Sequence, residues 1–334
     1  MIQAMAQGTF VIGIDAGGTH TRVACVDLDG RRLSSATGGG GSPTHNDDAE
    51  ENVRSTITRA LDGADLDPAR ASALVAGMAG FNRTGSNQGL GHNHRFAHFV
   101  AIDGLTCEKL LVNDAVVAHR GALSGRAGIV VVAGTGSMIL AIDEHGVETE
   151  SGQLEHYAGA ARHLVHDVVQ RILIEDGDPA DPLHAAALEH FGADDAHGLR
   201  QAVLRRSAGN RNDTKRSYGD FAPQVTALAD ESALADVALR HLAERTARGV
   251  QLLAPLMAAD PAPVACTGSM ARDLSFRTRL EHALTSGPWR AVELVPPRLD
   301  PLGGASLLAL EMVGIDPDDS ILQNLSPALA SADA

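Results

Sequence analysis

The stretch Phe10–Arg22 reads F-V-I-G-I-D-A-G-G-T-H-T-R and places an apolar run directly before one carboxylate, Asp15. Four small residues follow it: Gly17, Gly18, Thr19 and Thr21. Glycine allows the backbone to approach a phosphate closely, and backbone N–H groups and threonine hydroxyls are neutral donors to it. A carboxylate at the end of a buried strand can hold Mg²⁺, usually through water. The pattern predicts a phosphate-binding turn, and it leaves open a glycine-rich hairpin of no function.

The residues after the turn indicate the kind of element that carries it. Arg22–Val26 is a second β-prone run, closed by the turn Asp27–Gly30, so the glycines lie in a strand–turn–strand hairpin. In a dinucleotide fold or a P-loop they would open a helix instead. The same order of strand, Gly/Thr turn, strand and D-x-x-G turn occurs at Val11–Gly30 and again at Ile129–Gly146. Two such hairpins on similar halves are more specific than one.

A further carboxylate stands between the two hairpins. Lys109–Asn113 is a strand candidate that delivers Asp114 at its end. From that position a carboxylate can act as the general base on an acceptor hydroxyl. The alternative role is a helix N-cap before Ala115.

Periodicity predicts the elements that must position these residues. Another apolar strand, Pro263–Thr267, ends at Gly268 and Ser269, and Arg205–Arg216 and Pro317–Ala334 are expected to form a loop and a frayed end. Helices are expected over about Ala49–Leu61, Ala115–Leu123, Ala158–Ile174, Leu183–His190, Asp220–Leu228, Ser232–Leu253, Ala271–Leu284 and Gly303–Val313.

Composition limits the class of protein. The 334 residues suggest about two domains, and the net charge of −15 argues against binding a nucleic-acid backbone. Met1–Thr9 lack a basic region followed by an apolar stretch, and no apolar run is long enough for a membrane span, so we expect a cytoplasmic protein without a membrane partner. Three histidines in Gly91–His98 suggest a metal site, but such clusters are more often a solvated loop or helix face.

Three motifs now stand in order: D-A-G-G-T-H-T-R, N-D-A…A-G-T-G-S and T-G-S-M-A-R-D. Together, over most of Phe10–Val313, they resemble the actin-like ATPase and sugar-kinase superfamily. Within it they resemble the BadF/BadG/BcrA group, which contains N-acetylglucosamine kinase. The resemblance implies an α/β fold of two ribonuclease H-like domains, each with a mixed sheet, that close over an interdomain cleft. We place the first domain at residues 8–115 and the second, with a helical insertion, at 116–303. A helix over about 304–320 is expected to pack back on the first domain.

The resemblance also implies roles for single residues. Asp15 would hold Mg²⁺ through water, and Asp114 would be the catalytic base. The nucleotide would be bound by Gly17, Gly18, Thr19, Thr21, Thr135, Gly136, Ser137, Gly268 and Ser269. The acceptor would be bound by Ser42, Thr44, His45, Asn46, Gly80, Asn82 and Arg83.

The sequence departs from the family pattern after the second hairpin. Kinases of this family carry G-G-W-G and then G-D-E-G-S, whereas Ser151–Arg162 reads S-G-Q-L-E-H-Y-A-G-A-A-R. Gln153, Glu155 and His156 are the candidates to supply polar groups to the acceptor from this loop. These changes affect the identity of the acceptor more than the phosphate chemistry.

We therefore expect an ATP- and Mg²⁺-dependent kinase that phosphorylates a hydroxyl of an amino sugar, N-acetylglucosamine or glucosamine-like, and a homodimer is common among relatives. Alternatives are a cyclitol, an aminoglycoside-like or other natural-product acceptor, or a sensor that binds nucleotide and sugar without catalysis. Related activators of radical dehydratases hold an iron–sulfur cluster with cysteines. Cys25, Cys107 and Cys266 do not offer that arrangement.

Overall fold

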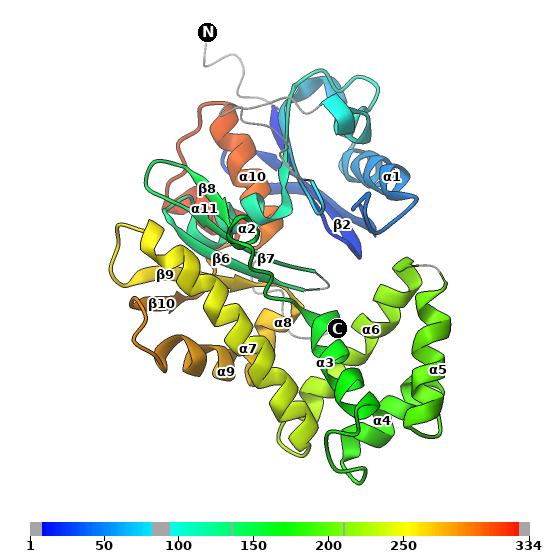
Figure 1. The fold of residues 1–334 in the computed structure, drawn as a ribbon. Helices are drawn as coiled ribbons and strands as arrows, with labels where there is room; N and C mark the ends of the chain where they lie inside the picture. Colours follow the sequence, from blue (N-terminus) through cyan, green and yellow to red (C-terminus); the bar gives the residue numbers. More distant parts are fainter. Residues whose placement is uncertain (1–8, 82–93, 135, 210, 327–334) are drawn as a thin grey trace. The chain divides into compact units, whose positions relative to one another are not determined.

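The computed structural model describes residues 9–81, 94–134, 136–209 and 211–326 (Figure 1). The chain divides into two compact units: Met1–Val130 with Pro296–Ala334, and Val131–Val295. The two five-stranded sheets have the orders β3-β2-β1-β4-β5 and β10-β9-β6-β7-β8. The fold is thus α/β with two mixed sheets, which confirms the predicted fold class. Every helix among the described residues is too short or too polar to span a membrane.

The first sheet combines a hairpin with parallel strands. Strands β1 (Phe10–Ala16), β2 (His20–Asp27) and β3 (Arg32–Gly39) are paired antiparallel. Strands β4 (Ala71–Met78) and β5 (Glu108–Asn113) continue the sheet parallel to β1. The three parallel strands therefore end at the same edge.

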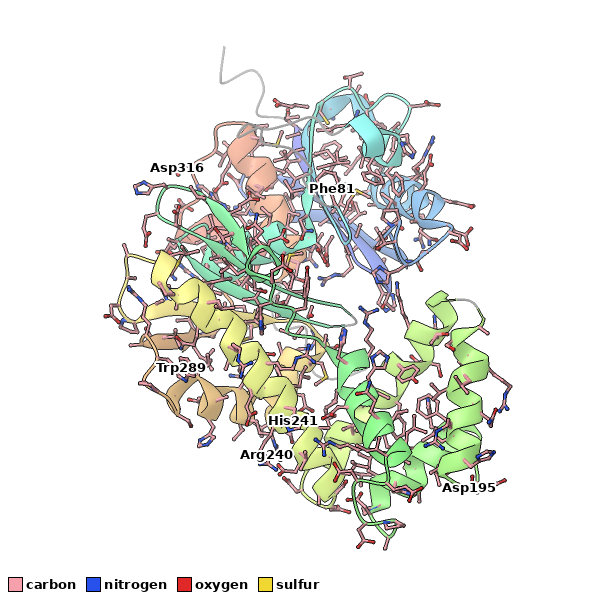
Figure 2. All side chains as sticks on the ribbon, in the orientation of Figure 1. Phe81, Asp195, Arg240, His241, Trp289 and Asp316 are labelled. Carbon is pink, nitrogen blue, oxygen red and sulfur yellow. The ribbon has the colours of Figure 1, made fainter. Side chains whose placement is uncertain are left out.

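Both faces of the first sheet are buried under helices. On one face Phe10, Ile12 and Ile14 of β1 pack with α1 (Ala49–Asp62). The same cluster includes Phe81, labelled in Figure 2, which is 2% exposed. On the other face Val11 packs with α2 (Asp114–Leu123) and α10 (Pro301–Met312). A strand buried on both faces reads as a continuous apolar run, as β1 does.

Helix α10 can approach β1 because residue 13 is a glycine. A Cβ at Gly13 would lie 2.4 Å from Ser306 Oγ and 2.7 Å from its backbone N. Helices α10 and α2 also meet through glycines, since a Cβ at Gly121 would lie 2.5 Å from the Asp300 carbonyl oxygen. These contacts join α2 to the first unit. The chain passes from the first unit to the second after Val130 and returns to the first after Val295. The domain limits expected from the sequence were residues 8–115 and 116–303.

The C-terminal region differs from the single helix predicted over about 304–320 and from the frayed end predicted from Pro317. Helix α10 ends at Met312, Gly314 has φ +80°, and a separate helix α11 spans Asp319–Leu325. Asp318 caps α11 by accepting from Ile321 N at 2.9 Å. The short helix is also fixed to the first hairpin, because Asn324 Nδ2 donates to the Asp29 carbonyl oxygen at 2.8 Å.

The second unit is built on β6 (Gly128–Ala133), β7 (Ser137–Ile142), β8 (Glu148–Glu150), β9 (Ala262–Thr267) and β10 (Val292–Val295). Strands β9 and β10 are parallel, and β7 and β8 are antiparallel. Its helices are α3 (Ala161–Leu173), α4 (Pro182–Phe191), α5 (Ala196–Ser207), α6 (Arg211–Ala227), α7 (Ala233–Leu253), α8 (Ser269–Arg272) and α9 (Leu274–Thr285). Short 3₁₀ helices are η2 (Pro68–Arg70) and η3 (His94–Val100) in the first unit, and η4 (Ser151–Leu154) and η5 (Ala254–Leu256) in the second.

The prediction of a loop over Arg205–Arg216 is wrong. Helix α5 includes Arg205 and ends at Ser207, and α6 already begins at Arg211. The basic residues there gave no apolar periodicity, but Leu199 and Ala202 of α5 and Tyr218 and Phe221 of α6 are buried. Tertiary packing therefore outweighs the weak local pattern.

The internal repeat seen in the sequence is confirmed in the geometry of its turns. After β2, Asp27 Oδ1 accepts from Asp29 N at 3.0 Å and from Arg31 N at 2.8 Å. After β7, Asp143 Oδ1 accepts from His145 N at 2.9 Å and from Val147 N at 2.8 Å. In both turns the aspartate side chain bonds to the backbone two residues on, which is the Asx-turn arrangement.

Candidate active site

The candidate residues of the first unit gather at the carboxyl edge of its sheet. The register pairs Ala16 of β1 with Met78 of β4, and Met78 with Asn113 of β5. Asp15 and Asp114 therefore stand near the ends of strands that are two places apart, which separates their backbones by about 10 Å. Ala79 N also donates to the Ala16 carbonyl oxygen at 2.9 Å, which continues this edge beyond the strands.

The first glycine turn is closed by its own backbone. Gly17 N donates to the His20 carbonyl oxygen at 2.9 Å, and the Gly17 carbonyl oxygen accepts from Gly41 N and Ser42 N at 3.0 and 3.2 Å. The N–H of Gly18 donates to no residue that the structure describes. This N–H is therefore a donor that a phosphate oxygen can accept from.

The two threonines of this turn differ in exposure. Thr19 is exposed, whereas Thr21 is 0% exposed. A Cβ at Gly41 would lie 2.6 Å from Thr21 Oγ1, so the Thr21 side chain packs closely against Gly41 in the loop after β3. The Thr21 hydroxyl has no hydrogen-bond partner among the described residues.

Asp15 is held by an arginine from the neighbouring strand. Arg22 Nη2 donates to Asp15 Oδ2 at 2.6 Å and Arg22 Nε donates to the same oxygen at 3.2 Å. Arg22 Nη1 donates to Asp300 Oδ2 at 2.7 Å. Burial raises the pKa of the Asp15 carboxyl above its ordinary value, and the charge of Arg22 opposes this shift.

Among the described residues, no three histidine, cysteine or acidic side chains are grouped as a metal site. Asp15 is the carboxylate that the end of β1 supplies to this turn, and its Oδ2 is already bonded to Arg22. A single carboxylate oxygen is suited to a Mg²⁺ ion that keeps most of its water ligands. It is not suited to an ion coordinated entirely by protein groups. The residues thus fit the water-mediated contact that the sequence predicted.

The predicted acceptor residues of the loop after β3 lie together beside the first turn. Ser42 Oγ donates to the Ala79 carbonyl oxygen at 2.8 Å and contacts His45 Nδ1 at 2.8 Å. Because the single proton of Ser42 is donated to Ala79, Ser42 Oγ acts as an acceptor in its contact with His45 Nδ1. Asn46 Nδ2 donates to the Gly18 carbonyl oxygen at 2.9 Å.

Thr44 and Gly80 complete this cluster. Thr44 Oγ1 lies 3.0 Å from Ser42 Oγ, and a Cβ at Gly80 would lie 2.6 Å from Thr44 Oγ1. Gly80 has φ +81°, a conformation that also favours glycine. Asn82 and Arg83, the remaining predicted acceptor residues, lie outside the described residues, as do His92 and Asn93 of the histidine-rich segment.

Asp114 is the first residue of α2 and is half-buried. The N-cap is Asn113, whose Oδ1 accepts from Ala115 N at 2.8 Å and whose Nδ2 donates to the Phe81 carbonyl oxygen at 2.8 Å. The cap role that the sequence left open for Asp114 therefore belongs to its neighbour. At the first position of the helix, the helix dipole also favours the ionised carboxylate.

The second turn, in the second unit, is open on its glycine face. Gly134 N donates to the Gly136 carbonyl oxygen at 3.0 Å, and a Cβ added at either glycine would meet no atom within 4 Å. Ser137 Oγ accepts from Gly159 N at 3.1 Å. Thr135 lies outside the described residues.

Gly268 stands directly against the second turn. It has φ +103°, and a Cβ there would lie 2.3 Å from the Ala133 carbonyl oxygen, so only glycine fits. The next residue, Ser269, is exposed at the start of α8, and Met270 is 4% exposed. The structure therefore brings the second and third motifs together.

The loop that departs from the family pattern uses two of its three candidate side chains for local structure. Gln153 Oε1 accepts from Glu150 N at 2.9 Å, and His156 Nε2 lies 2.8 Å from the Arg245 carbonyl oxygen of α7. Glu155 is exposed and has φ +57°. Gln153 and His156 thus hold the loop in place.

Sequence reasoning missed three residues that organise the site: Arg22, Asn113 and Asp300. The hairpin register, which pairs Asp15 with Arg22, was the available signal for the ion pair. Asp300 caps α10 by accepting from Gly303 N at 2.8 Å, and the D-P-x-G pattern was its signal. Nothing in the sequence indicated that Arg22 bridges both carboxylates.

Two mixed sheets with a glycine-turn hairpin in each unit define the class of this protein, an ATPase of the actin-like fold. The model of the BadF/BadG/BcrA/BcrD ATPase family matches residues 12–309, and the chain belongs to this family.

An N-acetylmuramic acid/N-acetylglucosamine kinase from Clostridium acetobutylicum is 29% identical over 157 residues, 45% of this chain and 48% of the relative. The match thus spans about half the length of that curated relative. A solved structure from Chromobacterium violaceum, provisionally described as an N-acetylglucosamine kinase, is 26% identical with a TM-score of 0.71 over 90% of this chain and 99% of the other. A ROK family glucokinase from Streptomyces griseus, in complex with glucose and AMPPNP, has a TM-score of 0.58 at 21% identity over 90% and 99% of the two chains, and supports the fold alone.

Proposed function

We propose that this protein is a sugar kinase that transfers the γ-phosphate of ATP to a hydroxyl of an amino sugar, N-acetylglucosamine or glucosamine-like. One observation carries the proposal: Asp114, the Gly18 turn and the Ser42–Asn46 cluster stand at one edge of one sheet. The names of the Clostridium and Chromobacterium relatives support the amino-sugar class.

Phosphoryl transfer depends mainly on the correct positioning of the reacting groups. Asp114 accepts the proton of the acceptor hydroxyl as that hydroxyl attacks the phosphate. The backbone N–H of Gly18 donates to a phosphate group of the nucleotide. In the second unit, the open glycine face of Gly134 and Gly136 is likewise suited to bind phosphate. Mg²⁺, when bound, would supply positive charge that neutralises the phosphates, and Asp15 is the residue that would hold it through water. His45 and Asn46 hydrogen-bond and orient the acceptor.

An ADP-release assay over a panel of acceptors tests the proposal. The panel holds N-acetylglucosamine, glucosamine, glucose, a cyclitol and an aminoglycoside. ADP release that depends on an amino sugar supports it. Turnover with only the cyclitol or the aminoglycoside would show that the protein is a kinase but that its acceptor is not an amino sugar. If calorimetry detects sugar binding but no ADP is released, the protein is a sensor and not a kinase. Because the proposed reaction uses ATP, we also infer that the protein is cytoplasmic. The homodimer expected from the sequence stays a prediction.

A further inference from the structure

One buried amide lies between the proposed general base and the acceptor loops of the first unit. Asn113 is the last residue of β5 and the N-cap of α2, directly before Asp114, and it is 6% exposed. Its register partner on the neighbouring strand is Met78, the last residue of β4. Asn113 therefore stands where the ends of both strands meet the first turn of α2.

Both polar atoms of this amide bond to the backbone. Oδ1 accepts from Ala115 N and Nδ2 donates to the Phe81 carbonyl oxygen, each at 2.8 Å. Because one partner is a donor and the other an acceptor, only this orientation of the amide satisfies both. Asn113 thus connects the start of α2 to the turn that follows β4.

The turn after β4 also carries contacts of the acceptor cluster. Ser42 Oγ donates to the Ala79 carbonyl oxygen at 2.8 Å. A Cβ at Gly80 would lie 2.6 Å from Thr44 Oγ1, so this turn and the loop after β3 are in close contact. The turn is therefore held on two sides, by the loop after β3 and by Asn113.

Burial makes the bond between Asn113 and Phe81 hard to replace. Phe81 is 2% exposed, and its ring centroid lies 5.9 Å from that of Phe96. A buried carbonyl group that loses its donor pays the cost of desolvation, because water does not reach it. We therefore expect the turn after β4 to shift when the amide of Asn113 is removed.

We propose that Asn113 is a positioning residue that fixes the general base, Asp114, relative to the acceptor cluster. Its Oδ1 bond sets the first turn of α2, which carries Asp114, and its Nδ2 bond sets the turn that contacts the cluster. A displacement of about 1 Å between reacting groups can cost about 10²-fold in rate. This inference rests on the proposed kinase function.

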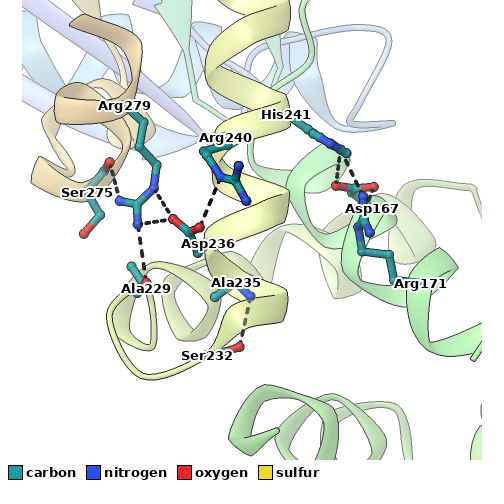
Figure 3. Close-up of polar contacts among 10 residues, drawn as sticks. All are labelled: Asp167, Arg171, Ala229, Ser232, Ala235, Asp236, Arg240, His241, Ser275 and Arg279. Carbon is teal, nitrogen blue, oxygen red and sulfur yellow. Dashed lines mark hydrogen bonds and ion pairs between the residues drawn. The ribbon is translucent and has the colours of Figure 1, made fainter. Parts of the chain in front are cut away.

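Asn113→Ala, which loses both bonds, tests the proposal with Ser232→Ala as its matched control. Ser232 is likewise a buried N-cap, 3% exposed, and its Oγ accepts from Ala235 N of α7 at 2.9 Å (Figure 3). Both variants should melt about 2–8 °C below wild type, as the loss of a cap predicts. Only Asn113→Ala should lower kcat/KM for N-acetylglucosamine, by about 10–100-fold, with ATP affinity unchanged. Equal losses of kcat/KM in the two variants would overturn the proposal.

Asn113→Ser separates the two bonds. Serine also caps helices, but it has no amide to donate to Phe81. The melting temperature and kcat should therefore return toward wild-type values, while KM for N-acetylglucosamine stays about tenfold higher. Hydrogen exchange should be faster in the turn after β4 and unchanged at the start of α2. A raised KM with unchanged exchange in that turn would mean that Asn113 touches the acceptor itself, and would overturn the positioning role.

The same measurements distinguish failure of this inference from failure of the kinase proposal. If wild type releases ADP and Asn113→Ala keeps its kcat/KM, the kinase stands and the role of Asn113 is overturned. If wild type releases no ADP, the kinase proposal fails, and calorimetry with N-acetylglucosamine decides on Asn113. Weaker sugar binding by Asn113→Ser, together with faster exchange in the turn after β4, then supports its positioning of the acceptor cluster. Unchanged binding or unchanged exchange overturns it.

Discussion

Arg22 Nη2 lies 2.6 Å from Asp15 Oδ2, at the end of the strand that leads into the first glycine turn. The side chains are 35% and 15% exposed, so the pair is largely shielded from water. The same guanidinium reaches Asp300, the N-cap of α10. One arginine therefore joins β1, β2 and α10 at the proposed phosphate site.

Arg22→Gln should lower the free energy of unfolding by about 1–3 kcal/mol, because it leaves the shielded Asp15 carboxylate without its charged donor. Urea denaturation at pH 7 measures the change. Arg31→Gln is the matched control in the same hairpin, since its ion pair with Asp29 is 64% and 68% exposed and should be worth about 0.5 kcal/mol or less. Equal losses in the two variants would contradict this account of Arg22. Adding Asp15→Asn to Arg22→Gln should recover part of the loss.

Asp114→Asn should reduce turnover by about 10²–10⁴, the usual range for removal of a general base. Nucleotide affinity should stay the same, since Asp114 is proposed to act on the acceptor hydroxyl. Stability should change little, because Asn113 provides the cap of α2. ADP release, nucleotide titration and thermal melting check the three expectations. If Asp114→Asn binds nucleotide and its turnover is not reduced, Asp114 is not the general base.

His119 should make the protein less stable in acid. The ring is 2% exposed with Nε2 3.0 Å from the Gly128 carbonyl oxygen, and burial lowers its pKa to about 4. Below the ordinary pKa of 6.5 the unfolded chain takes up a proton that the folded protein refuses, so stability present above about pH 6.5 is lost toward pH 4. By pH 5 the loss from this residue should be about 2 kcal/mol.

Urea denaturation of wild type and His119→Gln at about pH 7, 6 and 5 measures that loss. The glutamine keeps an N–H donor for Gly128 and removes the titration. Its stability should therefore fall less between pH 7 and pH 5 than that of wild type. Parallel curves for the two proteins would show that His119 is not the group responsible.

Gly13→Ala should destabilise the first unit by about 1–3 kcal/mol through overpacking between β1 and α10. Adding Ser306→Ala should not restore stability, because the Ser306 backbone N and Cα would still lie 2.7 and 2.9 Å from the new Cβ. Gly219→Ala is the control, since a Cβ there meets nothing within 4 Å and alanine favours the helix α6. Thermal melting of the three variants checks this, and full rescue by Ser306→Ala would contradict the backbone contact.

Most strands and the two glycine turns could be predicted from the sequence because their signals are local. The apolar run of β1 and the repeat at Ile129–Gly146 need only neighbouring residues to be recognised. Helix α5 and the start of α6 gave no such signal, since a few buried residues hold them through contacts distant in sequence. The division of the C-terminal segment into α10 and α11 likewise depends on Gly314 and on packing against the first hairpin.

The sequence by itself determined the order of strands and turns, the carboxylates at the strand ends and the family, because these depend on residue types at short spacing. Only the tertiary structure decided that Thr21 is buried, that Asn113 caps α2 and that Arg22 joins Asp15 to Asp300, 278 positions away from Arg22. The physical reason is that burial and ion pairing depend on which surfaces meet. That is fixed by the packing of whole helices on the sheet, which short sequence patterns do not contain.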